Sequence, residues 1–182
     1  MAIRSIVRLG HPALRTPAEP IDPEKLSDPE VQTLIDDMLE TMGDAQGVGL
    51  AAPQVGIGWQ LFVYAAVDPD GGRGVEDAEL KVLVNPAIEP APGEFVSDWE
   101  GCLSIPELRG LVPRHPTVRV HALDRHGEKL DYLAEGYEAR IVQHEFDHLN
   151  GIVFLDRMRG FRSLAFEDEW ETYMTTPEVP AE

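Results

Sequence analysis

Cysteine is almost absent from this chain, because Cys102 is the only one among 182 residues. An intramolecular disulfide is therefore excluded, and a lone cysteine fits a reducing compartment. Long apolar runs are also missing. No stretch approaches the roughly 18–20 consecutive apolar residues of a membrane span, and the N-terminus lacks the apolar centre of a signal peptide. These absences predict a soluble, cytoplasmic protein without membrane contact.

Basic residues are scarce as well, with 15 Lys and Arg against 33 Asp and Glu and a formal net charge of −18. This balance argues against a nucleic-acid-binding protein, because attraction to phosphate supplies nearly all non-specific affinity. Small molecules and peptides remain open as substrates. An apolar fraction of 43% is that of an ordinary globular protein, and the length favours one domain.

The order of the expected elements predicts an α+β fold, a single domain of antiparallel strands around a central buried helix. One helix is expected from Asp28-Pro29 to about Met42, where apolar residues recur at helical spacing. The central helix covers 136–150, with Gly151 at its end, and a last helix is expected over about 160–173. Strands are expected at 59–67, 80–84, 94–99, 108–112, 117–123 and 129–133.

Two segments stand out as acidic. Residues 68–79 carry three glycines and five acids, which indicates a solvated loop. Residues 167–182 contain six acids and no base, followed by prolines, so this C-terminal tail is expected to fray. Both segments are expected to leave any chemistry undisturbed.

The segment His144-Glu145-Phe146-Asp147-His148 carries the strongest chemical signal. Positions i and i+4 of a helix share one face, so both imidazoles can reach one metal ion. Glu145 projects beside them, where it can exchange protons with a water. The apolar neighbours Ile141, Val142 and Leu149 indicate a buried helix, in which two unpaired histidines would be costly. The central helix is therefore predicted to carry a metal-binding HExxH motif.

A catalytic metal needs a third protein ligand. The third histidine of one metalloprotease pattern would fall at position 154, which is Phe154. A thermolysin-like site would take a carboxylate from a later helix, where Glu167, Asp168 and Glu169 stand, although a solvated acidic face explains these residues better. Cys102 is the remaining candidate, because the other histidines are scattered singly.

Three segments resemble, in order and spacing, the three motifs of the peptide deformylases. They are Gly47-Val48-Gly49-Leu50-Ala51-Ala52-Pro53-Gln54, Glu100-Gly101-Cys102-Leu103-Ser104 and Gln143-His144-Glu145-Phe146-Asp147-His148-Leu149. The opening Gly10-His11-Pro12-Ala13-Leu14-Arg15 is similar to the N-terminal arm of that family. The resemblance covers roughly residues 3–165 and implies a catalytic domain over 1–166, with 167–182 as an appended tail.

The resemblance implies removal of the formyl group from the N-terminal formylmethionine of newly made polypeptides. It assigns three metal ligands: Cys102, His144 and His148. Glu145 would accept a proton from the attacking water and return it to the leaving amine. The side-chain amide of Gln54 and the backbone N–H of Leu103 would stabilise the oxyanion.

The family also implies where the peptide lies. Val48, Gly49 and Leu50 would line a groove in which the peptide pairs as an added strand. Ile141, one turn before His144, and Val48 would form walls of the methionine pocket. Arg109 would steady the peptide, and Arg114 would pair with Glu100.

One divalent metal per chain is expected. A Cys-His-His set suits Zn²⁺, Fe²⁺, Ni²⁺ or Co²⁺, and the resemblance implies Fe²⁺ in the cell, replaced by Zn²⁺ or Ni²⁺ in purified protein. The expected partners are N-formylmethionyl peptides on nascent chains, with transient proximity to the ribosome, no direct nucleic-acid binding and a monomeric state. Two alternatives stay open: a thermolysin-like metallopeptidase and a catalytically silent metal-binding module.

Overall fold

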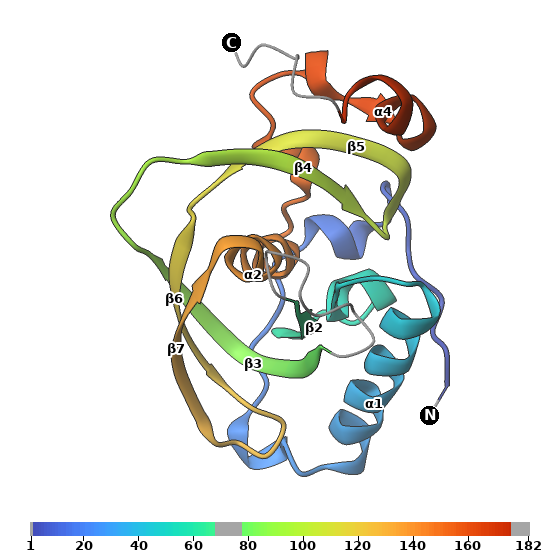
Figure 1. Ribbon diagram of the computed structural model, residues 1–182. Coiled ribbons are helices and arrows are strands. Elements are labelled where there is room, and N and C mark those ends of the chain that lie inside the picture. Colours follow the sequence, from blue (N-terminus) through green and yellow to red (C-terminus); the bar gives the residue numbers. More distant parts are fainter. Residues whose placement is uncertain (1, 68–77, 176–182) are drawn as a thin grey trace.

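Two antiparallel sheets lie on either side of one helix, α2 (Gly136–Leu149), which occupies the centre of the molecule (Figure 1). The structure is a computed structural model that describes residues 2–67 and 78–175. The larger sheet has the strand order β1-β2-β3-β6-β7 and the smaller one β4-β5-β8. The expected class, a single domain that mixes helices with antiparallel strands, is confirmed.

The element bounds follow the expected order closely. The other helices are α1 (Pro29–Asp44), α3 (Phe154–Arg157) and α4 (Glu167–Tyr173). The strands are β1 (Gly49–Ala51), β2 (Leu61–Ala66), β3 (Glu79–Pro90), β4 (Val96–Cys102), β5 (Ile105–Arg114), β6 (Thr117–Leu123), β7 (Lys129–Glu135) and β8 (Ala165–Phe166).

The main core fills the space between the larger sheet and the helices α1 and α2. Helix α1 begins at Pro29 after Asp28 and turns an apolar stripe inward, in agreement with the sequence pattern. Strand β2 is buried along nearly its whole length, which explains its continuous apolar run. The largest fully buried side chains there are Phe62, Tyr64, Ile35, Met38 and Met42.

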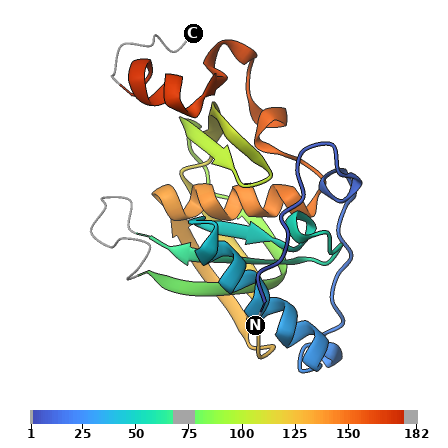
Figure 2. The ribbon, with the colours of Figure 1, turned by 90° about the vertical axis from the view of Figure 1, so that its right-hand side faces the viewer.

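The end of α2 is fixed against the N-terminal arm. Gly151 follows the helix with a φ of 70°, a backbone conformation that glycine adopts without strain. A Cβ built at Gly151 would lie 2.8 Å from the backbone carbon of Arg15. The arm therefore passes directly over the helix end, as Figure 2 shows for the blue N-terminal segment, and glycine is required there for contact as well as for conformation.

The C-terminal part differs from the expectation of one helix over 160–173. Phe161–Ser163 form a 3-10 turn, and the helix α4 begins only at Glu167. Between them Ala165 and Phe166 pair with Arg109 and Leu108 of β5. The free edge of β5 supplies hydrogen-bond partners for the backbone groups of this segment, which a helix would otherwise pair internally. The segment therefore forms a strand although its sequence pattern favours a helix.

Within the expected C-terminal tail, Glu167–Tyr173 form α4, which ends at the residue where the last helix was expected to end. Residues 176–182 of the expected tail, and 68–77 of the expected acidic loop, lie outside the described residues. In the ranges 2–67 and 78–175, no helix combines the length and apolar character needed to span a bilayer.

The strand expected at 80–84 continues to Pro90, with a bulge between Val84 and Ala87. Asn85 sits at this irregularity with a φ of 49°. Its side chain accepts a hydrogen bond from the Ile21 N–H at 2.8 Å and donates one to the Ile21 carbonyl at 2.6 Å. The side chain at the bulge thus satisfies both backbone polar groups of Ile21 and ties the N-terminal arm to the sheet.

Candidate metal centre and substrate pocket

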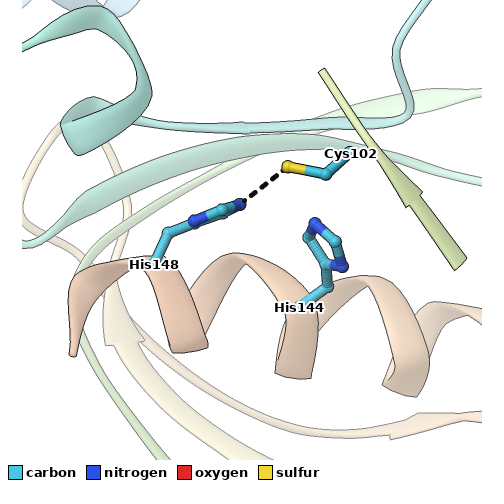
Figure 3. Close-up of side chains that lie close together, drawn as sticks. All are labelled: Cys102, His144 and His148. Atoms are coloured by element: carbon cyan, nitrogen blue, oxygen red, sulfur yellow. Dashed lines mark hydrogen bonds between the residues drawn. The ribbon is translucent and has the colours of Figure 1, made fainter. Parts of the chain in front are cut away.

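Three side chains from two distant segments converge above α2 (Figure 3). His144 and His148 project from adjacent turns of the helix, and Cys102 comes from the end of β4. Cys102 Sγ lies 3.3 Å from His148 Nε2. The three ligand atoms all lie within 4.8 Å of one another, a spacing at which they could hold one metal ion.

His144 is oriented by a carboxylate behind it. Its Nδ1 lies 2.9 Å from Oε2 of the buried Glu100. Arg114 donates two hydrogen bonds to Glu100, at 2.9 and 3.0 Å, so the pairing expected from the sequence is confirmed. An imidazole whose second nitrogen is held in this way has a fixed ring orientation and presents Nε2 to a metal.

The charge network extends further than the sequence indicated. Arg140 of α2 also binds Glu100, at 2.8 Å, and reaches the carbonyl oxygens of Val96 and Val112. It thereby ties the helix to β4 and β5. Only the approach of α2 to these strands brings the groups together, and no local pattern marks Arg140.

Asp147, inside the HExxH segment, anchors the other side of the network. It accepts a hydrogen bond from Arg114 at 2.5 Å and two from Arg157, at 3.0 and 2.6 Å. Three arginines and two carboxylates thus surround the base of the site. Each buried charge has an opposite partner, which is the condition for keeping charges in a protein interior.

Glu145 is buried beside the cluster and faces Gly49 of β1. Its Oε2 has no hydrogen-bond partner among the described residues. A Cβ built at Gly49 would overlap Oε1 of Glu145 and lie 2.8 Å from its Cδ. The absence of a side chain at Gly49 therefore makes the space that the carboxylate occupies.

Gln54 is fully buried next to Cys102. Its Oε1 accepts a hydrogen bond from the Ala51 N–H at 2.8 Å, which fixes the amide so that Nε2 points toward Cys102 Sγ, 3.5 Å away. Nε2 also lies 3.4 Å from the Ser104 hydroxyl. Gln54 thus presents a donor to the site. Leu103 follows Cys102 and lines the same cavity.

A cavity of about 600 Å³ opens beside the cluster, which is the size of a small-ligand or peptide-end pocket. Its walls include four of the residues expected to bind substrate: Val48, Gly49, Arg109 and Ile141. Leu50 is the exception. It is fully buried in the main core and does not line the cavity, because successive side chains of a strand point to opposite faces and Gly49 takes the face toward the site.

Burial and charge set the protonation of the acids at the site. Burial raises the pKa of Glu145 to about 7. Burial would also raise the pKa of Glu100, but hydrogen bonds with His144 and Arg114 hold it well below its ordinary value. These partners therefore stabilise Glu100 as an anion at the back of the site.

The pKa values of the two histidines are shifted in opposite directions. Burial lowers the pKa of His148 well below its usual value, which favours the neutral imidazole that ligates metals. Burial also acts on His144, but hydrogen bonds with Cys102 and Glu100 raise its pKa well above the usual value. These hydrogen bonds thus stabilise the protonated form of the His144 imidazole.

Known proteins of one family are similar to this chain over most of its length. The family model described as polypeptide deformylase matches residues 3–163. The peptide deformylase 2 of Bordetella bronchiseptica is 43% identical over 91% of this chain and 93% of its own length. That of Ralstonia nicotianae is 41% identical over 98% and 97%. The chain belongs to the peptide deformylase family. Its activity is accordingly the hydrolytic removal of the formyl group from the N-terminus of new polypeptides.

Solved deformylase structures have the same fold. A class I type b peptide deformylase from Acinetobacter baumannii, bound to Met-Ala-Ser, matches with a TM-score of 0.77 and 37% identity over 86% of this chain and 99% of that one. A deformylase from Legionella pneumophila matches with a TM-score of 0.76 and 41% identity over 88% of each chain.

The deformylase family depends on a metal, and the residues present fit one. One thiol sulfur and two imidazole nitrogens form a donor set typical of catalytic zinc and iron sites. The thermolysin-like alternative finds no support. The carboxylate of Glu167 is paired with Arg109 and not with the histidines. The metal-binding module without catalysis finds none either.

Proposed function

We propose that Cys102, His144 and His148 hold one divalent metal and that α2 is the rigid central element carrying the HExxH motif. The convergence of these three ligand atoms beside a peptide-sized cavity is the observation that carries this proposal. When bound, such a metal supplies Lewis acidity and lowers the pKa of a water molecule. Fe²⁺ is the expected ion in the cell, and Zn²⁺, Ni²⁺ or Co²⁺ the expected replacements in purified protein.

Glu145 is the proposed general base and acid. Its carboxylate is buried at the cavity wall with one oxygen unpartnered among the described residues. From this position it takes a proton from the attacking water and passes it to the amine that leaves when the formyl C–N bond breaks. A positioned carboxylate of this kind contributes about 10²–10⁴ in rate.

Gln54 and Leu103 are the proposed donors to the oxyanion that forms as water adds to the formyl carbon. The side-chain amide of Gln54 is fixed by its own hydrogen bond to Ala51, so its direction is set before substrate arrives. The backbone N–H of Leu103 stands directly after Cys102. One such donor lowers the barrier by about 3 kcal/mol.

The peptide is proposed to lie along Val48 and Gly49, with the methionine side chain against Val48 and Ile141 and the following residues toward Arg109. All four residues line the cavity. The substrates are thus N-formylmethionyl nascent chains, met close to the ribosome in the cytoplasm. The net charge of −18 disfavours direct binding to RNA, and the chain is expected to act as a monomer.

Gly49→Ala is expected to lower kcat on the order of a hundredfold, the effect of displacing a reacting group by about 1 Å. The new Cβ would overlap the Glu145 carboxylate and push it from its position. Gly58→Ala is the matched control, because a Cβ there meets nothing within 4 Å. Formate release by the two variants gives the comparison, and equal rates would contradict the assigned position of Glu145.

The proposed function is tested by formate release from formyl-Met-Ala, with an unblocked longer peptide as the comparison. We expect formate from the first substrate and no internal cleavage of the second. Internal cleavage would favour an endopeptidase, and no reaction with either peptide would favour a binding module.

A further inference from the structure

The C-terminal helix α4 lies at the rim of the substrate pocket. Figure 2 shows it over the small sheet, on the side away from the larger sheet, and strand β8 attaches it to β5 through Leu108 and Arg109. The pocket wall includes Glu167, the first residue of α4. The acidic C-terminal segment, expected from the sequence to leave the chemistry undisturbed, therefore reaches the site.

Arg109 is held on three sides. Glu167 Oε1 accepts hydrogen bonds from its Nε, at 3.0 Å, and from its Nη2. The ring of Trp170 lies 5.4 Å from the guanidinium carbon, and this ring packs against Trp99 with centroids 6.0 Å apart. On the third side, a Cβ built at Gly101 would overlap Nη1 and lie 2.8 Å from Cζ. The guanidinium thus rests on the backbone of the residue that precedes Cys102.

This arrangement leaves a defined part of Arg109 for substrate. Nε and Nη2 are occupied by Glu167, while Nη1 lies over Gly101 at the pocket wall. A guanidinium has only donors and presents them in a fixed plane. Holding that plane in advance removes the entropy that a free arginine would lose on binding. The carboxylate also compensates the positive charge, which would otherwise attract acidic side chains.

We propose that Glu167 is a positioning and specificity-determining residue. It holds Arg109 over Gly101, so that the guanidinium donates to the peptide backbone beyond methionine. It also compensates the charge of Arg109, so that acidic side chains of the substrate are not preferred. This inference rests on the proposed role of Arg109 in binding the peptide. It makes α4 a functional part of the pocket, and it predicts that the enzyme accepts neutral and acidic residues after methionine without favouring the acidic ones.

The test uses Glu167→Gln, which keeps the shape and removes the charge, in the metal-loaded full chain. Glu169→Gln is the matched control. Glu169 is exposed and stands about 200° round the helix from Glu167. The probes are Met-Ala-Ser and Met-Asp-Ser, whose dissociation constants are measured by calorimetry. Neither peptide carries a formyl group, so binding is measured without turnover.

For Glu167→Gln we expect Met-Ala-Ser to bind about three- to fivefold more weakly, the effect of losing a partly exposed ion pair. The affinity for Met-Asp-Ser should rise relative to that for Met-Ala-Ser by a similar factor, because the positive charge of the guanidinium is no longer compensated by a carboxylate. With formyl-Met-Ala-Ser the KM should rise while kcat stays within about twofold. In an Arg109→Gln background the Glu167→Gln change should have no further effect.

Three results would each overturn the inference. They are an unchanged ratio of the dissociation constants of the two peptides, an equal effect of Glu169→Gln, and additive effects in the Arg109→Gln background. So would a failure of the unaltered protein to bind Met-Ala-Ser. Failure of the proposed function would be seen in a different measurement, as the absence of formate release. That measurement is independent of the ratio of the peptide dissociation constants.

Discussion

Replacing Glu145 with glutamine is expected to lower kcat for formyl-Met-Ala by a factor of about 10²–10⁴, the contribution of a positioned proton-transfer group. The amide keeps the shape of the side chain but can neither accept the proton from water nor deliver it to the leaving amine. Glu145 is not among the three converging ligand residues, so the variant should keep its full metal content. Formate release and metal analysis on the same preparation separate the two effects.

The control for this experiment is Glu135→Gln, at an exposed position just before α2. It changes the net charge by the same amount and should leave turnover unchanged. Turnover of Glu145→Gln near that of the control would exclude Glu145 as the proton-transfer group. Loss of metal from the variant would instead place Glu145 among the ligands.

Cys102→Ala is expected to abolish both metal retention and formate release. Two imidazoles remain after the change, and catalytic sites of this type use three protein ligands. Cys102 is only half-buried and lies at the end of β4, so removal of its sulfur should leave the fold intact. Metal content after gel filtration, formate release and a thermal melt measure the three quantities.

Glu169→Ala serves as the control for the carboxylate alternative, and it should lose neither metal nor activity. A full metal content in Cys102→Ala would refute the assignment of the thiolate as a ligand. A loss of the folded state in Cys102→Ala would instead show that the sulfur is needed for stability; Cys102→Ser, which keeps nearly the same volume, then repeats the metal measurement in a folded chain.

The local part of the site could be predicted from the sequence. His144 and His148 are four residues apart, and helical geometry alone places such a pair on one face. The apolar residues around them indicated burial, and α2 covers Gly136–Leu149, almost the range expected. The start of α1 followed in the same way from Asp28-Pro29, since capping and first-turn preferences act over a few residues. Cys102 needed more than local physics, because a lone cysteine is usually only a core residue; its assignment depended on the resemblance of three motifs together.

The sequence by itself therefore determined the fold class, the helix that carries the histidines and the pairing of His144 with His148 on one face, because each depends on periodicity or short spacing. Only the tertiary structure decided which partners those residues meet. Arg109 and Glu167 are 58 residues apart in the chain, and Arg114 and Asp147 are 33 apart. Ala165 and Phe166 became a strand because the edge of β5 was free, and Leu50 turned to the core because Gly49 faces Glu145. Each of these outcomes is fixed by the packing of one element against a distant one, and no local pattern contains that information.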